Sequence, residues 1–249
     1  MIKDYYLGFK LSFSYFSILP MRFKESDRLD SPKVYGAMLF FFPLVGLVLG
    51  FMTIGIFLVL ENLSWYGAIL SALIYLMLYG FLHLEAVSDV FDALYASHAG
   101  KDAYAIIKEP TIGAMGMLYT LGFVVLKLSG IVYLLLHGLF VEFIAILIIS
   151  RLSLLLLFYV HNFRSSFATT LKSALNKYIL LLALSFYSLI AMNMSEYFFV
   201  LLLFGVIFAI MLSYWLKYKL GFINGDVMGT TLESVEIILF IIISYIISI

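Results

Sequence analysis

The segment FVEFIAILIISRLSLLLLFYV, residues 140–160, contains only two charged side chains, Glu142 and Arg151, among mostly apolar ones. A helix needs about 20 mainly apolar residues to cross the hydrocarbon core of a bilayer. The segment therefore predicts a membrane-spanning helix. Arg151 stands near its middle, where a charge costs at least about 2.5–3.5 kcal/mol. This arginine requires either a partner or a water-filled cavity.

Similar segments occupy most of the chain. Of its 249 residues, 64% are hydrophobic and 12% are charged, whereas soluble domains are about 45–50% apolar and about 25% charged. We expect an all-α fold, a polytopic membrane bundle of about seven or eight membrane-embedded helices. It forms a single integral membrane domain over residues 1–249. The other predicted spans are residues 35–60, 63–84, 112–136, 178–192, 197–216 and 234–249.

The first apolar stretch, residues 5–20, contains Lys10 and many aromatic residues. It lacks a signal-peptide cleavage site, so we expect it to be retained, either as a span or as an amphipathic helix in the interface. The formal net charge is zero, which argues against nucleic acid as a partner. The absence of cysteine excludes a disulfide framework and a thiolate nucleophile.

Two kinds of connection alternate along the chain. The turns near residues 61, 137 and 193 carry no Lys or Arg, whereas the other connections hold most of the 15 basic residues. By the positive-inside rule, the basic loops face the cytoplasm of a bacterial or archaeal cytoplasmic membrane. The acidic residues follow the same side, and Glu233 and Glu236 are predicted in or beside these loops. The active face should therefore be cytoplasmic.

The segment HLEAVSDVFD, residues 83–92, places Glu85, Asp89 and Asp92 at positions i, i+4 and i+7, on one helix face. Three carboxylates on one face repel each other unless a cation lies among them. Hard oxygen ligands favour magnesium, manganese or calcium. The alternative is a solvated acidic helix end. His83 points away from this face, which leaves it as a base, a substrate contact or an interfacial histidine.

The segment GFINGDVMGTTLE, residues 221–233, repeats that spacing with Asp226, Thr230 and Glu233. Its glycines permit close backbone approach to a ligand, and a glycine-rich turn that opens into a helix suits phosphate. Helix packing is the alternative role for Gly229.

Basic side chains accompany both acidic segments. Lys108 and Arg164 are either phosphate contacts or positive-inside anchors. Lys127 and Arg151 lie deep in their predicted spans, where they either bind an anionic substrate or neutralise buried carboxylates or helix-end carbonyls. Acidic and basic groups on one membrane face favour metal-dependent phosphoryl or pyrophosphate chemistry.

In these motifs the sequence resembles the cobalamin synthase family, adenosylcobinamide-GDP ribazoletransferase. The family's block GGLHLDG appears as GFLHLEA, residues 80–86, followed by Asp89 and Asp92. Its lysine-containing block appears as KEPTIGAMG, residues 108–116, and its last block as residues 221–233. The three blocks occur in the family's order. Glu85 and Glu109 replace aspartates, and Thr111 stands where a basic residue is frequent.

The resemblance implies a transferase reaction. The ribose hydroxyl of α-ribazole, or of its 5′-phosphate, attacks the cobinamide-linked phosphate of adenosylcobinamide-GDP, GMP leaves, and Mg²⁺ is the expected cofactor. The resemblance also leaves room for a homo-oligomer, or for a complex with other enzymes of cobalamin assembly. The metal set it implies is Glu85, Asp89, Asp92 and Asp226. The catalytic set adds His83, with His83 or Asp226 as general base. The substrate-binding set is Lys108, Arg151, Arg164, Asn224, Gly225 and Glu233.

Two other classes remain open. One is another membrane-embedded phosphotransferase or prenyltransferase, although the spacing of the acids fits those families poorly. The other is a secondary transporter with Lys127 and Arg151 along its substrate path. Transporters often contain internal repeats, and the sequence shows no convincing one.

Overall fold

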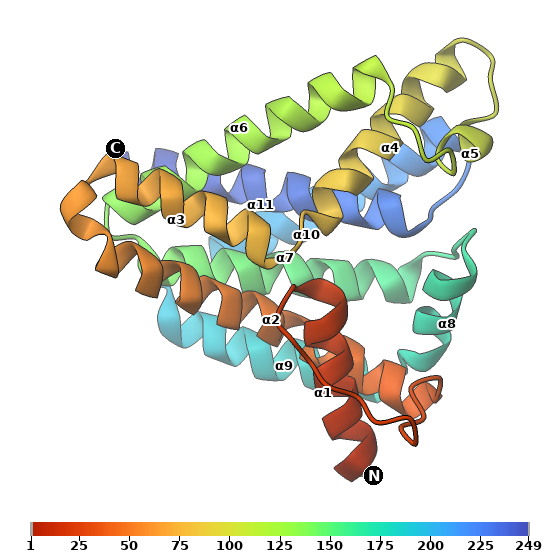
Figure 1. Ribbon diagram of the computed structural model, residues 1–249, viewed down its shortest axis with the longest axis horizontal. Coiled ribbons are helices and arrows are strands. Elements are labelled where there is room, and N and C mark those ends of the chain that lie inside the picture. The colour runs from red at the N-terminus through yellow and green to blue at the C-terminus, as the bar shows by residue number, and fades with distance from the viewer. Residues whose placement is uncertain (1, 249) are drawn as a thin grey trace.

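The computed structural model describes residues 2–248, and all regular structure within them is helical (Figure 1). In chain order the elements are α1 (Ile2–Phe16), α2 (Pro32–Val59), the 3-10 turn η1 (Glu61–Leu63), α3 (Trp65–Leu78), α4 (Leu82–His98), α5 (Ala103–Ile106), α6 (Ala114–Leu136), α7 (Phe140–Val160), α8 (Ser166–Ala174), α9 (Lys177–Met194), α10 (Phe198–Leu220) and α11 (Gly225–Ser248).

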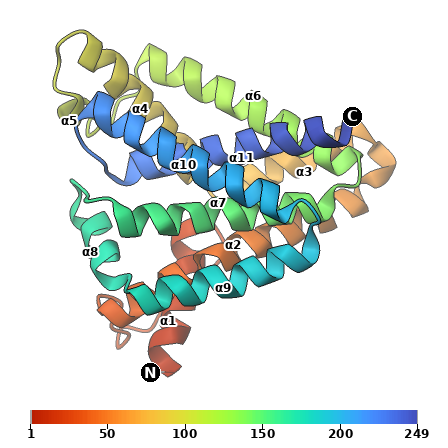
Figure 2. The same ribbon diagram turned by 180° about the vertical axis from the view of Figure 1, so that it is seen from behind.

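Six helices, α2, α6, α7, α9, α10 and α11, are each long and apolar enough to cross a membrane. The bent pair α3–α4 makes a seventh crossing if it forms one span. The predicted all-α membrane bundle is therefore confirmed. Helix α7 runs through its centre, with α2, α9, α10 and α11 packed around it (Figures 1 and 2).

The loops sort to the two ends of the bundle as the charge pattern predicts. The connections that carry most basic residues, together with α5 and α8, lie at one end (Figure 1). The turns between α2 and α3, α6 and α7, and α9 and α10 lie at the other. We call the end with α5 and α8 the loop end.

The predicted span over residues 63–84 is wrong as a single straight helix. Helix α3 ends at Leu78, and α4 starts at Leu82 at an angle of 78° to it. Gly80 and Phe81 both adopt positive φ, at 68° and 56°, which stops the helix because a left-handed residue cannot continue it. The bend lays the acidic helix α4 against α11 and α6.

The last span also differs from its prediction, because α11 begins at Gly225 rather than near residue 234. Asn224 caps this helix by accepting a hydrogen bond from the backbone N–H of Val227, at 3.0 Å. As a result, Glu233 and Glu236 lie inside the helix and are fully buried. Their predicted place in or beside a loop is wrong.

Helix α1 does not resemble the other spans. Its 15 residues extend roughly 22 Å, less than the roughly 30 Å of a hydrocarbon core. It crosses α2 at a steep angle (Figure 1), and Gly8 is the contact point, because a Cβ there would collide with the backbone of Val34 and Met38. Lys10 is buried, and its amine donates to the carbonyl of Arg22. This placement favours an embedded helix that lies across the bundle over a span.

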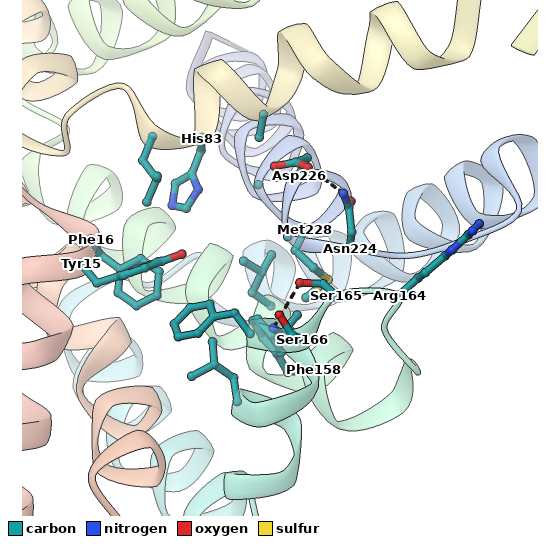
Figure 3. A pocket seen from close by; sticks show the side chains of 18 of the residues that line it. Tyr15, Phe16, His83, Phe158, Arg164, Ser165, Ser166, Asn224, Asp226 and Met228 are labelled. Atoms are coloured by element: carbon teal, nitrogen blue, oxygen red, sulfur yellow. Dashed lines mark hydrogen bonds between the residues drawn. The ribbon is translucent and has the colours of Figure 1, made fainter. Parts of the chain in front are cut away.

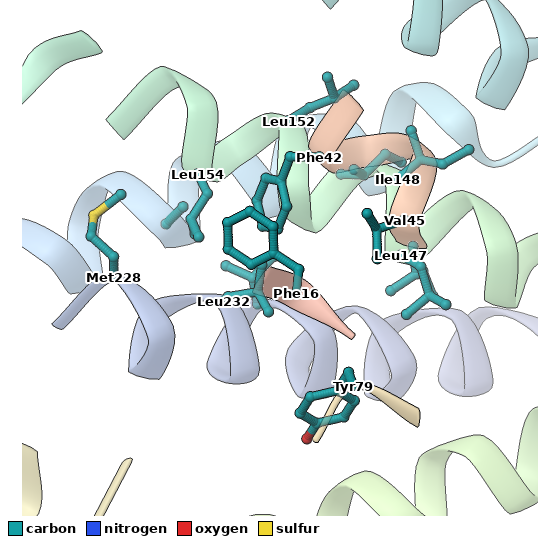
Figure 4. Packing of buried hydrophobic residues seen from close by; sticks show 14 of the residues in the cluster. Phe16, Phe42, Val45, Tyr79, Leu147, Ile148, Leu152, Leu154, Met228 and Leu232 are labelled. Atoms are coloured by element: carbon teal, nitrogen blue, oxygen red, sulfur yellow. The ribbon is translucent and has the colours of Figure 1, made fainter. Parts of the chain in front are cut away.

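The crossing of α1 brings its aromatic end into the core. Phe16 lies beside Phe42 of α2, with ring centroids 4.2 Å apart. Figure 4 shows the pair among Leu154 of α7 and Leu232 of α11. The apolar core thus reaches the loop end, where it borders a cavity.

Candidate active site

A cavity of about 400 Å³ opens between the helices at the loop end (Figure 3). Its lining comes from α1, α2, α4, α5, α7, α8 and α11 together with the adjoining loops. Ligand pockets commonly measure about 300–1,000 Å³, so the cavity is large enough for a small organic ligand. Three residues predicted for the active site, His83, Asn224 and Asp226, meet on one side of it.

The polar side of the cavity is built by the start of α11 and the start of α4. The amide of Asn224 donates to the carboxylate of Asp226 at 2.6 Å. His83 is only 8% exposed and hangs from α4 into the cavity (Figure 3). Its imidazole makes no hydrogen bond to any of residues 2–248. Because the imidazole faces the cavity, a ligand bound there can form a hydrogen bond with it.

Close packing of α11 against α4 fixes this geometry. A Cβ on Gly229 would lie 2.8 Å from the side chain of Ala86 and 3.3 Å from His83. The hydroxyl of Thr230 donates to the carbonyl of Ala86 at 3.0 Å. Gly229 therefore packs helices and borders the site at the same time.

Two cations from different loops meet at one aromatic ring on the rim. The Arg164 guanidinium lies 3.7 Å from the ring centroid of Tyr104, and the Lys108 amine lies 4.1 Å from it. The Tyr104 hydroxyl donates to the backbone carbonyl of Arg164 at 3.1 Å, and the backbone N–H of Arg164 donates to the carbonyl of Ile223 at 2.7 Å. Neither cation forms an ion pair within residues 2–248. They can therefore attract an anion to the cavity.

The acidic face of α4 lies next to this cavity. Asp89 is half-buried and faces the negative charges of Asp226, Glu85 and Asp92. Asp92 accepts from the backbone N–H groups of Gly113 and Gly116, at 2.6 and 2.8 Å. Within residues 2–248, no three His, Cys, Asp or Glu side chains are grouped so as to hold a metal ion alone. The predicted metal site therefore remains a prediction.

The deep charges form a separate buried ion cluster, made of Lys127, Arg151, Glu233 and Glu236. The Lys127 amine lies 2.5 Å from Glu233 and 2.8 Å from Glu236, and Arg151 lies 2.7 Å from Glu236. Ser150 also donates to Glu236, at 3.1 Å. The alternative in which the two cations neutralise buried carboxylates is confirmed. Arg151 and Glu233, predicted to bind substrate, do not line the cavity.

Much of the cavity wall consists of residues that the sequence motifs do not include. They are Tyr15, Phe16, Phe42, Tyr104, Leu154, Phe158, Ser165, Ser166, Phe167, Ala168 and Leu171. The Tyr15 hydroxyl points into the cavity (Figure 3), and partial burial together with the charge of Asp226 raises the pKa of this phenol. Ser165 and Ser166 could have been noticed in the sequence as a helix start, because Ser165 caps α8. The aromatic residues are indistinguishable from the many others in an apolar chain.

Comparison with known proteins gives one consistent family. The cobalamin-5-phosphate synthase family matches residues 8–244. An adenosylcobinamide-GDP ribazoletransferase of Clostridium perfringens is 27% identical over 246 residues, which cover 94% of this chain and 96% of the relative. A protein of the same name from Brevibacillus brevis is 29% identical over 81% of this chain and 84% of its own length.

A third relative of that name, from Chlorobium chlorochromatii, is 31% identical over 57% of this chain and 54% of its own. No solved structure matches the chain. The family match covers nearly all the helices and every residue of the cavity wall. The chain therefore belongs to the cobalamin-5-phosphate synthase family, whose fold here is a membrane-embedded helical bundle.

Proposed function

We propose that this enzyme transfers α-ribazole, or its 5′-phosphate, to adenosylcobinamide-GDP and releases GMP. The ribose hydroxyl forms a new P–O bond to the cobinamide-linked phosphorus, the bond to the GMP phosphate breaks, and the hydroxyl proton goes to a base. One observation supports the proposal in this family member. A single cavity brings together the candidate base His83, the carboxylate of Asp226, and two cations, Lys108 and Arg164, that form no ion pair within residues 2–248.

The residues of the chain divide this task by position. Lys108 and Arg164 at the rim attract and orient the anionic pyrophosphate. Asp226 and His83 face the cavity and are the two candidates to accept the hydroxyl proton. Asn224 orients the Asp226 carboxylate through its 2.6 Å hydrogen bond.

Magnesium fits the acids beside the cavity. Asp89, Glu85 and Asp226 repel one another, and none forms an ion pair within residues 2–248. Mg²⁺ usually keeps several waters and takes one or two carboxylates together with substrate phosphates, so a site completed by the pyrophosphate suits these side chains. When bound, the ion neutralises phosphate charge and stabilises the leaving GMP. Asp92 supports the site by holding α4 to the start of α6.

We place the loop end at the cytoplasmic side of the membrane, because it carries most of the basic residues. The transporter alternative loses its main support, since Lys127 and Arg151 are paired with buried carboxylates rather than lining a path.

The test is an assay of GMP release by the purified protein with adenosylcobinamide-GDP, α-ribazole and Mg²⁺. We expect GMP release that depends on both substrates and on the metal, and that His83→Gln and Asp226→Asn each reduce. A protein that is folded by circular dichroism but releases no GMP with any divalent metal would refute the proposal. Accumulation of unchanged corrinoid in vesicles would support a transporter instead.

A further inference from the structure

One half of the cavity is aromatic rather than polar. We call it the aromatic chamber, and its residues are Tyr15, Phe16, Phe42, Phe158 and Phe167. They come from α1, α2, α7 and α8, none of which carries an acidic motif. Figure 3 shows Tyr15, Phe16 and Phe158 across the cavity from Asp226 and Asn224.

Contacts between the rings hold the chamber in shape. The ring centroids of Tyr15 and Phe167 lie 5.1 Å apart, and this contact joins α1 to α8. Phe16 and Phe42 pack at 4.2 Å and anchor the wall in the core. Tyr15 is 44% exposed and Phe167 is partly exposed, so these two rings present surface to a ligand, while the buried rings of Phe16, Phe42 and Phe158 lie behind them.

A polar group that lacks a hydrogen-bonding partner faces the chamber from the polar side of the cavity. His83 is 8% exposed, its imidazole points into the cavity, and it makes no hydrogen bond within residues 2–248. The Tyr15 hydroxyl points toward the same space (Figure 3). A ligand that satisfies both features has an apolar aromatic face and a small number of hydrogen-bonding groups at one edge.

The size and polarity of the cavity indicate which part of the two proposed substrates can occupy the chamber. About 400 Å³ accommodates a nucleoside but not a corrin macrocycle with its side chains. A guanine ring carries several donors and acceptors, and each would lose its water against this wall of phenyl rings. An apolar bicyclic base loses nothing comparable and gains stacking with the rings.

We propose that the aromatic chamber binds the base of the acceptor nucleoside, a planar and apolar heteroaromatic ring, with its ribose directed toward His83 and Asp226. This inference rests on the proposed function for the identity of the acceptor. The proposal gives the crossing of α1 a role, because the end of α1 supplies Tyr15 and Phe16 to the chamber. The GDP-linked substrate then approaches from the side of Lys108 and Arg164.

The test measures binding without turnover. Full-length protein in detergent micelles is titrated with α-ribazole, with benzimidazole and with guanosine by isothermal titration calorimetry. We expect α-ribazole and benzimidazole to bind and guanosine to bind at least about tenfold more weakly. Phe167→Ala should weaken benzimidazole binding by about tenfold, on the scale of one lost aromatic stacking contact.

Two further variants separate a lost contact from a lost fold. Tyr15→Phe keeps the ring and should retain benzimidazole binding, whereas Tyr15→Leu should weaken it. Phe199→Ala removes a ring that is 68% exposed at the start of α10, and it should leave binding unchanged. If Phe167→Ala does not fold, the Tyr15 pair still decides the outcome.

Different results would refute the assignment of the chamber and the proposed reaction. Tight guanosine binding, or unchanged benzimidazole binding in both Phe167→Ala and Tyr15→Leu, would overturn the chamber assignment even if GMP is released. Ring-dependent benzimidazole binding without any GMP release would refute the proposed reaction and leave the base site standing. In steady-state assays the chamber variants should raise KM for α-ribazole and not for adenosylcobinamide-GDP.

Discussion

The buried ion cluster and the acids beside the cavity are both groups of charges on membrane-embedded helices, but they are balanced differently. The cluster sets Lys127 and Arg151 against Glu233 and Glu236, and every member is almost fully buried. The charged neighbours of Asp89, beside the cavity, are the carboxylates Asp226, Glu85 and Asp92, and Asp89 forms no ion pair within residues 2–248.

Balanced charges that exclude water serve the fold, whereas unbalanced charges near an opening are available to a ligand. A charged residue in a membrane helix therefore points to a ligand site only when the structure shows that no opposite charge in the protein neutralises it. The following predictions test this division between a structural cluster and a chemical face, from the largest expected effect to the smallest.

Removing one carboxylate from the cluster should have the largest effect on stability. Glu236→Ala leaves both Lys127 and Arg151 short of a counter-charge, and losing one partner of a buried pair costs about 3–5 kcal/mol. Thermal unfolding in detergent should show a large drop in Tm. Glu61→Ala, on an exposed turn, is the matched control. Equal Tm values for the two variants would show that the cluster is not structural.

Removing a carboxylate from the acidic face should affect activity and not stability. Asp89→Asn removes a charge that its neighbours repel, so Tm should stay the same or rise. GMP release should fall by about 100-fold or more, the scale for losing one preorganised charge contact in a transition state. Asp30→Asn, in the exposed loop before α2, is the control for activity. GMP release by Asp89→Asn at the wild-type rate would show that Asp89 is not part of the active site.

A methyl group at Gly116 should disturb the junction that connects α4 to α6. A Cβ there would lie 2.6 Å from the carbonyl of Ser88 and 2.7 Å from the carboxyl carbon of Asp92. We expect Gly116→Ala to lower stability by about 1–3 kcal/mol, as overpacking does. Gly122→Ala on the same helix, where a Cβ meets nothing within 4 Å, should be neutral or stabilising. Equal unfolding temperatures for the two would mean that α4 and α6 separate freely.

The smallest effect is expected at the aromatic ring shared by Lys108 and Arg164. Cation–π contacts contribute about 0.5–2 kcal/mol, so Tyr104→Leu should raise KM for the GDP-linked substrate by about 2- to 30-fold with little change in kcat. Tyr104→Phe keeps the ring and should restore most of the affinity. A KM increase in Tyr104→Phe as large as in Tyr104→Leu would assign the effect to the hydroxyl instead.

The sequence predicted the helical class, most spans and the end of the bundle that carries the basic loops. These features depend on local composition, because a bilayer requires long apolar helices whatever their neighbours are. It missed the bend after Leu78, which depends on left-handed backbone at Phe81 as well as at Gly80. A phenylalanine carries no signal for that conformation.

The predicted site residues also fall into two groups, those that meet at the cavity and those that do not. His83, Asn224 and Asp226 do meet at one cavity, together with Lys108 and Arg164 at its rim. Arg151 and Glu233 belong to the buried ion cluster instead. Only the packing of α6, α7 and α11 decides whether a deep charge finds a partner.

Local pattern by itself therefore determined that this chain is a membrane bundle, and it identified the short segments that contribute the candidate site residues. The tertiary structure decided which charges neutralise one another, which remain open to a ligand, and which aromatic rings form a chamber. The physical reason is that burial and pairing are properties of contacts between helices distant in sequence. The crossing of α1 over α2 is an example, since it brings Tyr15 and Phe16 to a site whose motifs begin at residue 80.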